Sequence, residues 1–238
     1  MSGVEDVIAA AQSGEMERLA SLLDANPSLA TASNMLGVQA IHAAHFGGHA
    51  SAVDLLLSRG VVLDAFLAAE LGMLNRVRQA VAADPQVVHA LSPVGSALLH
   101  RACYWGQTEV ARYLLDQGAD ADAATCDGFL QIRPLGCAVA TPNIPNPSDR
   151  EEVVLELVGM LLARGAGVNG RRRDGLTALH SAAYRGHLRV ITVLLDRGAD
   201  PALRGYEGMG AHASQTAADV AASQGQEEAY SLLRGVAA

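Results

Sequence analysis

One phrase of this sequence returns along most of its length and limits what the chain can fold into. In its clearest copy it runs from Ala178 to His187 and continues from Val190 to Asp200. Weaker copies recur at intervals of about 33 residues, a period typical of helix-turn-helix repeats. Because so short a unit cannot bury its apolar side alone, neighbouring units must pack side by side. We therefore expect an all-α repeat solenoid.

The segment from Gly175 to His187 resembles the ankyrin repeat. It reads Gly-Leu-Thr-Ala-Leu-His-Ser-Ala-Ala-Tyr-Arg-Gly-His, where the family has Gly-x-Thr-Pro-Leu-His-x-Ala-Ala, and only the proline is replaced, by Ala178. Val190 to Asp200 matches the family's second helix and its Gly-Ala-Asp ending. The resemblance covers nearly the whole chain. It implies a stack of helix pairs with short β-hairpin fingers, and a function in protein binding.

A glycine that ends the first helix of each unit sets the register of the repeats. It stands at Gly14, Gly48, Gly72, Gly106, Gly186 and Gly225, and one further unit lacks it. We predict one ankyrin repeat domain over residues 1–238 with about seven units. Their approximate ranges are 1–33, 34–63, 64–91, 92–124, 125–170, 171–203 and 204–238.

Two of these units are irregular. Gly48 and Gly72 are closer than one repeat, so the finger before the third unit must be short or absent. The fifth unit carries an insertion at 141–151, whose three prolines make it stiff. Such a loop either folds over the neighbouring units as a lid or is inert.

In the ankyrin family, ligands usually lie in the concave groove, which the fingers and the ends of the first helices line. Six of the few aromatic residues fall at these positions: Phe46, Tyr104, Trp105, Phe129, Tyr184 and Tyr206. Aromatic rings concentrate at binding hot spots because they bring much contact area at little entropic cost. Charged residues stand among them, and we select Glu70, Asp127 and Arg185 as further partner-binding candidates.

These residues favour a non-catalytic scaffold that captures a protein or peptide in its groove, centred on Tyr104, Trp105, Tyr184 and Arg185. The alternative is a small-molecule binder or an atypical enzyme, with a pocket closed by the insertion. In that case Glu70, Asp127 or His212 would be the general acid or base. A deep pocket with a carboxylate at its floor would favour this alternative over an open groove.

The histidines offer little support for catalysis or for a metal site. His42, His100 and His180 occupy the motif position, where the resemblance implies an imidazole bonded to backbone groups of the fingers. His49 and His187 match the family's Gly-His start of the second helix. His45, His89 and His212 remain, and no two of them have metal-ligand spacing. We therefore predict no catalytic residue, no metal and no cofactor.

Composition narrows the possible partners. The 17 basic and 25 acidic residues give a formal charge of -8, which opposes nucleic-acid binding. No apolar stretch approaches the roughly 18 residues of a membrane span. The three cysteines are odd in number and lack zinc spacing, which favours a reducing, cytoplasmic location. All basic residues are arginine and alanine is abundant, which suggests a bacterial source.

Overall fold

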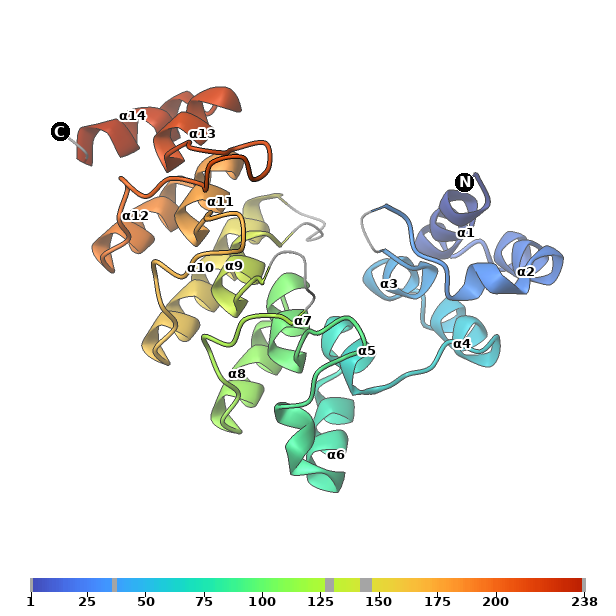
Figure 1. Ribbon diagram of the computed structural model, residues 1–238. Helices are drawn as coiled ribbons and strands as arrows, with labels where there is room; N and C mark the ends of the chain where they lie inside the picture. The colour runs from blue at the N-terminus through green and yellow to red at the C-terminus, as the bar shows by residue number, and fades with distance from the viewer. Residues whose placement is uncertain (1, 36–37, 127–130, 142–146, 237–238) are drawn as a thin grey trace. The chain divides into compact units, whose positions relative to one another are not determined.

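The computed structural model describes residues 2–35, 38–126, 131–141 and 147–236, and within them the chain forms fourteen α-helices (Figure 1). The chain divides into two compact units, Met1–Leu71 and Gly72–Ala238. The first holds α1 (Ser2–Ser13), α2 (Met16–Ala25), α3 (Ala40–Phe46), α4 (Ala50–Ser58) and α5 (Ala65–Glu70). The second holds α6 (Leu74–Ala83), α7 (Leu98–Tyr104), α8 (Thr108–Asp116), α9 (Pro134–Val139), α10 (Pro147–Ala163), α11 (Ala178–Arg185), α12 (Leu188–Asp196), α13 (Ala217–Ser223) and α14 (Glu227–Val236).

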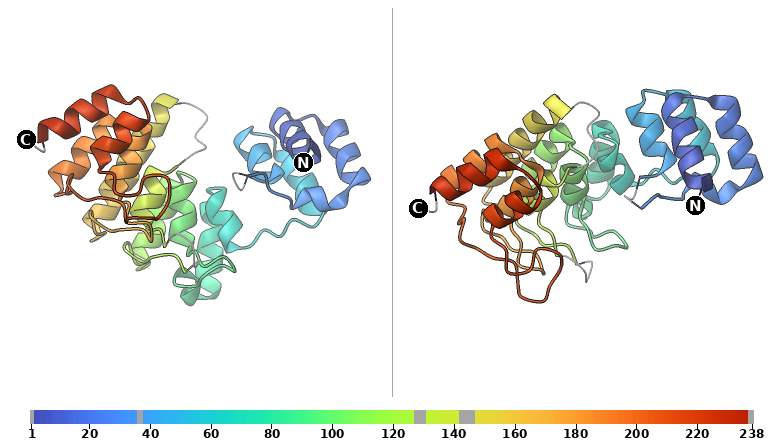
Figure 2. Two further views of the ribbon diagram at one scale, coloured as in Figure 1. Left: turned by 45° about the horizontal axis from the view of Figure 1, so that its top comes forward. Right: turned by 90° about the horizontal axis from the view of Figure 1, so that it is seen from above.

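The helices of the second unit stand in two rows. Helices α7, α9, α11 and α13 pack in sequence along one row, and α8, α10, α12 and α14 along the other (Figures 1 and 2). The first unit repeats this order, with α1 against α3 and α2 against α4. This is the expected all-α repeat solenoid. One helix pair falls in each of the seven predicted repeat ranges, although the exact division stays a prediction.

Each register glycine permits the tight turn between the paired helices. Gly14, Gly48, Gly72, Gly106, Gly186 and Gly225 all have φ between 67° and 77°. This left-handed conformation is open to glycine and strained for other residues. At Gly186 (φ 71°) a side chain would also meet Gln226, which directly precedes α14, the second helix of the next pair. The same residue therefore serves the turn and the contact between repeats.

The fingers are irregular loops closed by a few backbone hydrogen bonds. Among residues the structure describes there is no continuous strand, only isolated bridges such as Ser33 with Gln39. The Ser92 amide donates to the Ser96 carbonyl at 2.9 Å, and the Arg172 amide to the Leu176 carbonyl at 2.8 Å. In the second unit these loops gather on one side of the helices (Figure 2). Together with the row α7, α9, α11 and α13 they form what we call the inner face.

The core consists of the apolar sides of the two helix rows. Leu114 and Leu194, from α8 and α12, are fully buried, as are the small residues Ala102 and Ala182 of α7 and α11. Alanine lets neighbouring first helices approach closely, while the leucines of the second helices fill the space behind them.

The cysteines follow this pattern, because Cys103 and Cys137 are buried in first helices and Cys126 is exposed on a finger. Burial raises the pKa of the Cys103 thiol well above its usual value.

The insertion is largely outside the described part of the chain. Residues 142–146 are not described, and α10 begins at Pro147, inside the predicted insertion 141–151. Proline suits the first turn of a helix because the amide it lacks would have no helical partner there. Of the helices described, none is both long enough and apolar enough to cross a bilayer.

Candidate functional site

Two of the three motif histidines bind the backbone of the adjacent finger. The Nε2 atom of His100 lies 2.9 Å from the Ala123 carbonyl, and that of His180 lies 3.2 Å from the Gln215 carbonyl. The Nδ1 atom of each accepts from an amide at the start of its own helix. With Nδ1 accepting, Nε2 carries the proton and donates. The scaffold role that the resemblance implies is confirmed for these two residues.

His42 differs, because its Nε2 lies 2.7 Å from the Oε2 atom of Glu70. Only residues 59–64 join α4 to α5, so this repeat has no full finger to supply a carbonyl. The carboxylate of Glu70, on α5, accepts the hydrogen bond of His42 instead. Glu70 is 7% exposed. This corrects the expectation that Glu70 faces a partner. Its side chain is buried and accepts the hydrogen bond of His42.

Trp105 also departs from expectation. It ends α7 at the predicted position, but its side chain is only 6% exposed, and its ring meets Tyr104 edge-on at 5.8 Å. The large apolar ring of Trp105 is buried within the repeat stack, where burial stabilises the fold. This corrects the expectation that Trp105 is an exposed hot spot for a partner. Tyr104 is half-buried. Burial raises the pKa of its hydroxyl, Cys137 adds to this, and nearby Arg185 opposes it.

The other predicted residues are spread over both units and the undescribed part of the chain. Phe46, in the first unit, is half-buried and meets His45 edge-on at 5.5 Å. Desolvation lowers the pKa of that histidine. Asp127 and Phe129 lie outside the described residues. None of these observations tests a binding role.

Tyr184, Arg185 and Tyr206 all lie on the second unit. Tyr184 is 46% exposed and Tyr206 is 47% exposed. Arg185 reaches the Ala140 carbonyl at 2.8 Å. The Tyr206 ring lies under the guanidinium of Arg171 at 5.1 Å, and Arg171 also donates to the Arg204 carbonyl at 2.9 Å. The exposed ring of this finger therefore packs against one arginine that is itself bonded to the backbone.

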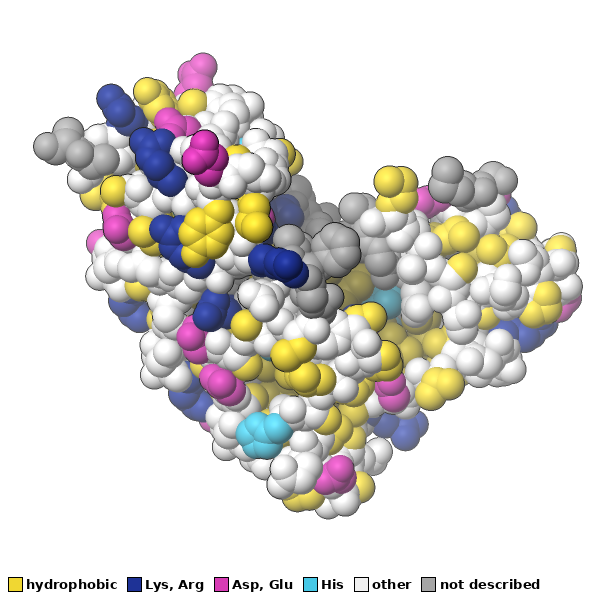
Figure 3. Space-filling view, viewed as in Figure 1, with side chains coloured by type: hydrophobic (Ala, Val, Ile, Leu, Met, Phe, Trp, Pro, Cys, Tyr) yellow, Lys and Arg dark blue, Asp and Glu magenta, His cyan; other side chains and the backbone are white. Residues whose placement is uncertain are grey.

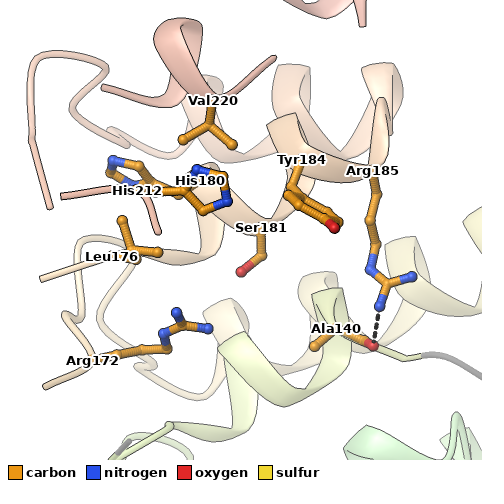
Figure 4. A pocket seen from close by; sticks show the side chains of 9 residues that line it. All are labelled: Ala140, Arg172, Leu176, His180, Ser181, Tyr184, Arg185, His212 and Val220. Atoms are coloured by element: carbon orange, nitrogen blue, oxygen red, sulfur yellow. Dashed lines mark hydrogen bonds between the residues drawn. The ribbon is translucent and has the colours of Figure 1, made fainter. Parts of the chain in front are cut away.

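Tyr184 and Arg185 line a partly open pocket of about 230 Å³ (Figure 4). Its lining comes from two neighbouring fingers, from α11, from the end of α9 and from α13. The nine residues are Ala140, Arg172, Leu176, His180, Ser181, Tyr184, Arg185, His212 and Val220. The Tyr184 and His212 rings meet edge-on at 5.7 Å. His212 is in turn anchored through Nδ1, which lies 2.8 Å from the Gln215 side-chain oxygen.

The pocket contains residues that sequence reasoning did not bring together. His212 was expected only as a candidate general acid or base of the small-molecule alternative, and its lack of a scaffold role was the available signal. Arg172 belongs to the arginine run 171–173. Nothing in the sequence indicated that its side chain faces the pocket. Ser181 sits at a variable position of the motif. These side chains meet because adjacent repeats face one another across the pocket.

The pocket is rich in hydrogen-bond donors, and no Asp or Glu is among its lining residues. Over the C-terminal repeats, arginine and hydrophobic side chains stand side by side on the surface (Figure 3). Within the described chain there is no cluster of three or more His, Cys, Asp or Glu side chains that could hold a metal. The local chemistry suits a ligand with an apolar body and an electron-rich group.

Comparison with known proteins establishes the class of this protein. Residues 7–125 and 150–236 match the family described as ankyrin repeats (3 copies). The match covers most of the chain, so the protein belongs to the ankyrin repeat family. Ankyrin repeats are in general scaffolds for protein–protein interaction.

Individual relatives are long proteins that share this repeat region. The chain is 34% identical over 113 residues to the mouse serine/threonine-protein kinase TNNI3K, covering 47% of this chain and 12% of that protein. It is 27% identical over 217 residues to the rice probable E3 ubiquitin-protein ligase XBOS32, covering 82% and 38%. Mouse B-cell lymphoma 3 protein homolog is 36% identical over 110 residues, covering 46% and 22%. The chain thus spans less than half the length of each, and these relatives are eukaryotic, so the predicted bacterial source gains no support from them.

Proposed function

We propose that this chain is a non-catalytic scaffold that captures a segment of a protein partner on the inner face of its second unit. The observation that carries the proposal is the pair of exposed tyrosines, Tyr184 and Tyr206, beside a pocket rich in donors. Half-exposed rings on a rigid repeat bring contact area that costs little entropy to immobilise. Arg185, from the predicted set, lies at the same place.

The side chains around these two rings are preorganised by contacts within the chain. Tyr184 rests on His212, and Tyr206 rests under Arg171, which two backbone carbonyls fix. Preorganised side chains lose less freedom on binding, so more of the contact energy appears as affinity. The neighbouring Met209, 45% exposed, extends the apolar area along the last finger.

The pocket favours this proposal over the enzyme alternative. A carboxylate at the pocket floor would favour that alternative, and the lining has none; of the three candidate acids or bases, only His212 is among the lining residues. Glu70, one of its proposed acids, is buried against His42. The volume of about 230 Å³ is also below the range of roughly 300–1,000 Å³ typical of small-molecule sites, and it suits one inserted side chain.

The test uses a random peptide library displayed on phage and selected on the immobilised full chain. Selected peptides should bind the Tyr184→Ala, Tyr206→Ala double variant about 30-fold more weakly, which corresponds to the loss of one or two hot-spot rings. Affinity is measured by fluorescence polarisation with each peptide labelled.

The matched control is Tyr230→Ala, because Tyr230 is 38% exposed but lies on α14, in the other helix row. Its affinity for the peptides should equal that of the unaltered chain. Circular dichroism verifies that all variants keep their helices. Peptides that bind the double variant and the unaltered chain equally well would place capture elsewhere and refute the proposal.

A further inference from the structure

We infer that the pocket beside Tyr184 binds a carboxylate presented by the captured segment, which makes it the subsite that selects acidic partners. This inference rests on the proposed function, since it names the chemistry that the inner face recognises. It is built on four observations: a clamped arginine, unused hydroxyl groups, an apolar floor, and a lining without acidic residues.

Arg172 supplies the planar donor. Its Nε atom lies 3.1 Å from Oδ1 of Asp174, and its Nη2 atom also bonds Asp174 through Oδ2. These bonds use two of the five N–H groups of a guanidinium and leave others for a ligand. Figure 4 shows the guanidinium reaching toward Ser181 across the pocket. A guanidinium fork matches a carboxylate in geometry as well as in charge.

Asp174 keeps this fork in place. Burial acts to raise the pKa of Asp174, but hydrogen bonds from Arg172 and from the Leu176 amide outweigh it and lower the pKa below its usual value. The carboxylate therefore stays ionised and clamps Arg172 from behind. A guanidinium that is already ordered loses little freedom when it binds a second carboxylate on its other edge.

Two hydroxyl groups add donors on the helix side. The hydroxyls of Ser181 and Tyr184 make no hydrogen bond with any residue in the described part of the chain. Ser181 lies between Arg172 and Tyr184 in the pocket (Figure 4). A carboxylate with two oxygens can accept from the guanidinium and from a hydroxyl at once.

The rest of the pocket suits the aliphatic part of an acidic side chain. Leu176 is 8% exposed and Val220 is fully buried, and the Tyr184 and His212 rings form a wall. The charge balance favours an anion, because the Arg172–Asp174 pair is neutral as a whole and Arg185 adds a positive charge to the lining. A neutral amide of equal size would gain the same apolar contacts, but it has one acceptor oxygen and no negative charge and so would bind the guanidinium less strongly.

The experiment compares three synthetic pools of short peptides on the immobilised full chain. All are N-acetylated. The first is C-amidated with a central Glu, the second is identical but with Gln, and the third lacks acidic residues and has a free C-terminal carboxylate. We expect about tenfold higher retention of the Glu pool than of the Gln pool, corresponding to one charge-assisted bond pair. Higher retention of the third pool than of the Gln pool would also support carboxylate recognition and would identify the chain terminus as its source.

The variants assign the effect to this pocket. Arg172→Gln should abolish the preference for carboxylate, and Arg172→Lys should weaken it because the planar fork of donors is lost. Ser181→Ala removes one hydroxyl donor with little change in packing and should reduce the preference. Arg197→Gln removes an exposed arginine at the end of α12 and should leave the preference unchanged. A preference that survives both Arg172→Gln and Ser181→Ala would overturn the assignment to the pocket.

Equal retention of all three pools would overturn carboxylate recognition itself. The proposed function is judged separately, by whether retention of any pool falls in the Tyr184→Ala, Tyr206→Ala variant. If it does fall, the inner face still captures peptides and only the chemistry assigned to the pocket is wrong. If no pool depends on the tyrosines, the proposed function fails as well.

Discussion

His42 and Glu70 are joined through a buried hydrogen bond of 2.7 Å, where the other motif histidines use a backbone carbonyl. Both side chains are almost fully removed from water, so this bond supplies each with a charged or polar partner at a buried position. The pair shows how this protein compensates for a shortened finger. It replaces a main-chain acceptor with a side chain from the following helix.

Replacing Glu70 should destabilise the first unit. Glu70→Leu leaves the Nε2–H of His42 buried without its acceptor, and we expect the free energy of unfolding to fall by about 3 kcal/mol. Glu70→Gln retains an acceptor oxygen and should cost about 1 kcal/mol. Urea unfolding measures both. Glu17→Gln, at an exposed site on α2, is the control, and an equal loss in all three variants would contradict the role of the pair.

Trp105→Ala should damage the fold itself. The ring is 6% exposed, so its removal leaves a cavity, with an expected loss of about 3–5 kcal/mol in the free energy of unfolding. Tyr184→Ala, at a ring that is 46% exposed, should cost about 1 kcal/mol or less. Both are measured by urea unfolding. A Trp105→Ala variant as stable as Tyr184→Ala would show that the ring is not part of the core.

Acid should destabilise the second unit through its motif histidines. Burial lowers the pKa of His100 and of His180 below the usual 6.5, although backbone carbonyls oppose this. The unfolded chain therefore binds more protons than the folded chain as the pH falls through 6.5, and the stability present above that pH is progressively lost. Unfolding free energies in a pH series should show this decline.

The contribution of these two residues can be isolated by substitution. A His100→Gln, His180→Gln variant is expected to be less stable at neutral pH, because its hydrogen bonds are altered. Its free energy of unfolding should nevertheless depend less steeply on pH below 6.5, since two titrating groups are gone. Parallel pH profiles of the variant and the unaltered chain would exclude these histidines as the cause.

Gly186→Ala should cost more stability than Gly198→Ala. Both glycines have positive φ, 71° and 85°, so both variants incur backbone strain of about 1 kcal/mol. At Gly186 the new methyl group would also clash with the side-chain oxygen of Gln226, and moving the end of this flexible side chain adds a small further cost, while at Gly198 nothing lies within 4 Å. Thermal unfolding compares the two. Adding Gln226→Ala should remove the excess cost, and an unchanged difference would show that the contact between repeats is not its source.

The repeat pattern alone determined the helix pairs, their register and the family. It did so because a helix-turn-helix unit depends on local features: apolar spacing, a glycine that accepts positive φ, and a histidine that ties the helix start to the next finger. It also located Tyr184 and Tyr206 on exposed positions. These features repeat with the sequence and therefore can be read from it.

Only the tertiary structure decided which side chains are free to act. Trp105 and Glu70 hold positions that the register assigns to the groove, but the ring of one packs on Tyr104 and the carboxylate of the other binds His42. The pocket likewise joins Arg172 to His212, which come from different repeats. The physical reason is that exposure and pairing depend on what the neighbouring repeat presents at close range. A periodic pattern specifies the face of a helix, and the packed neighbours determine what that face can bind.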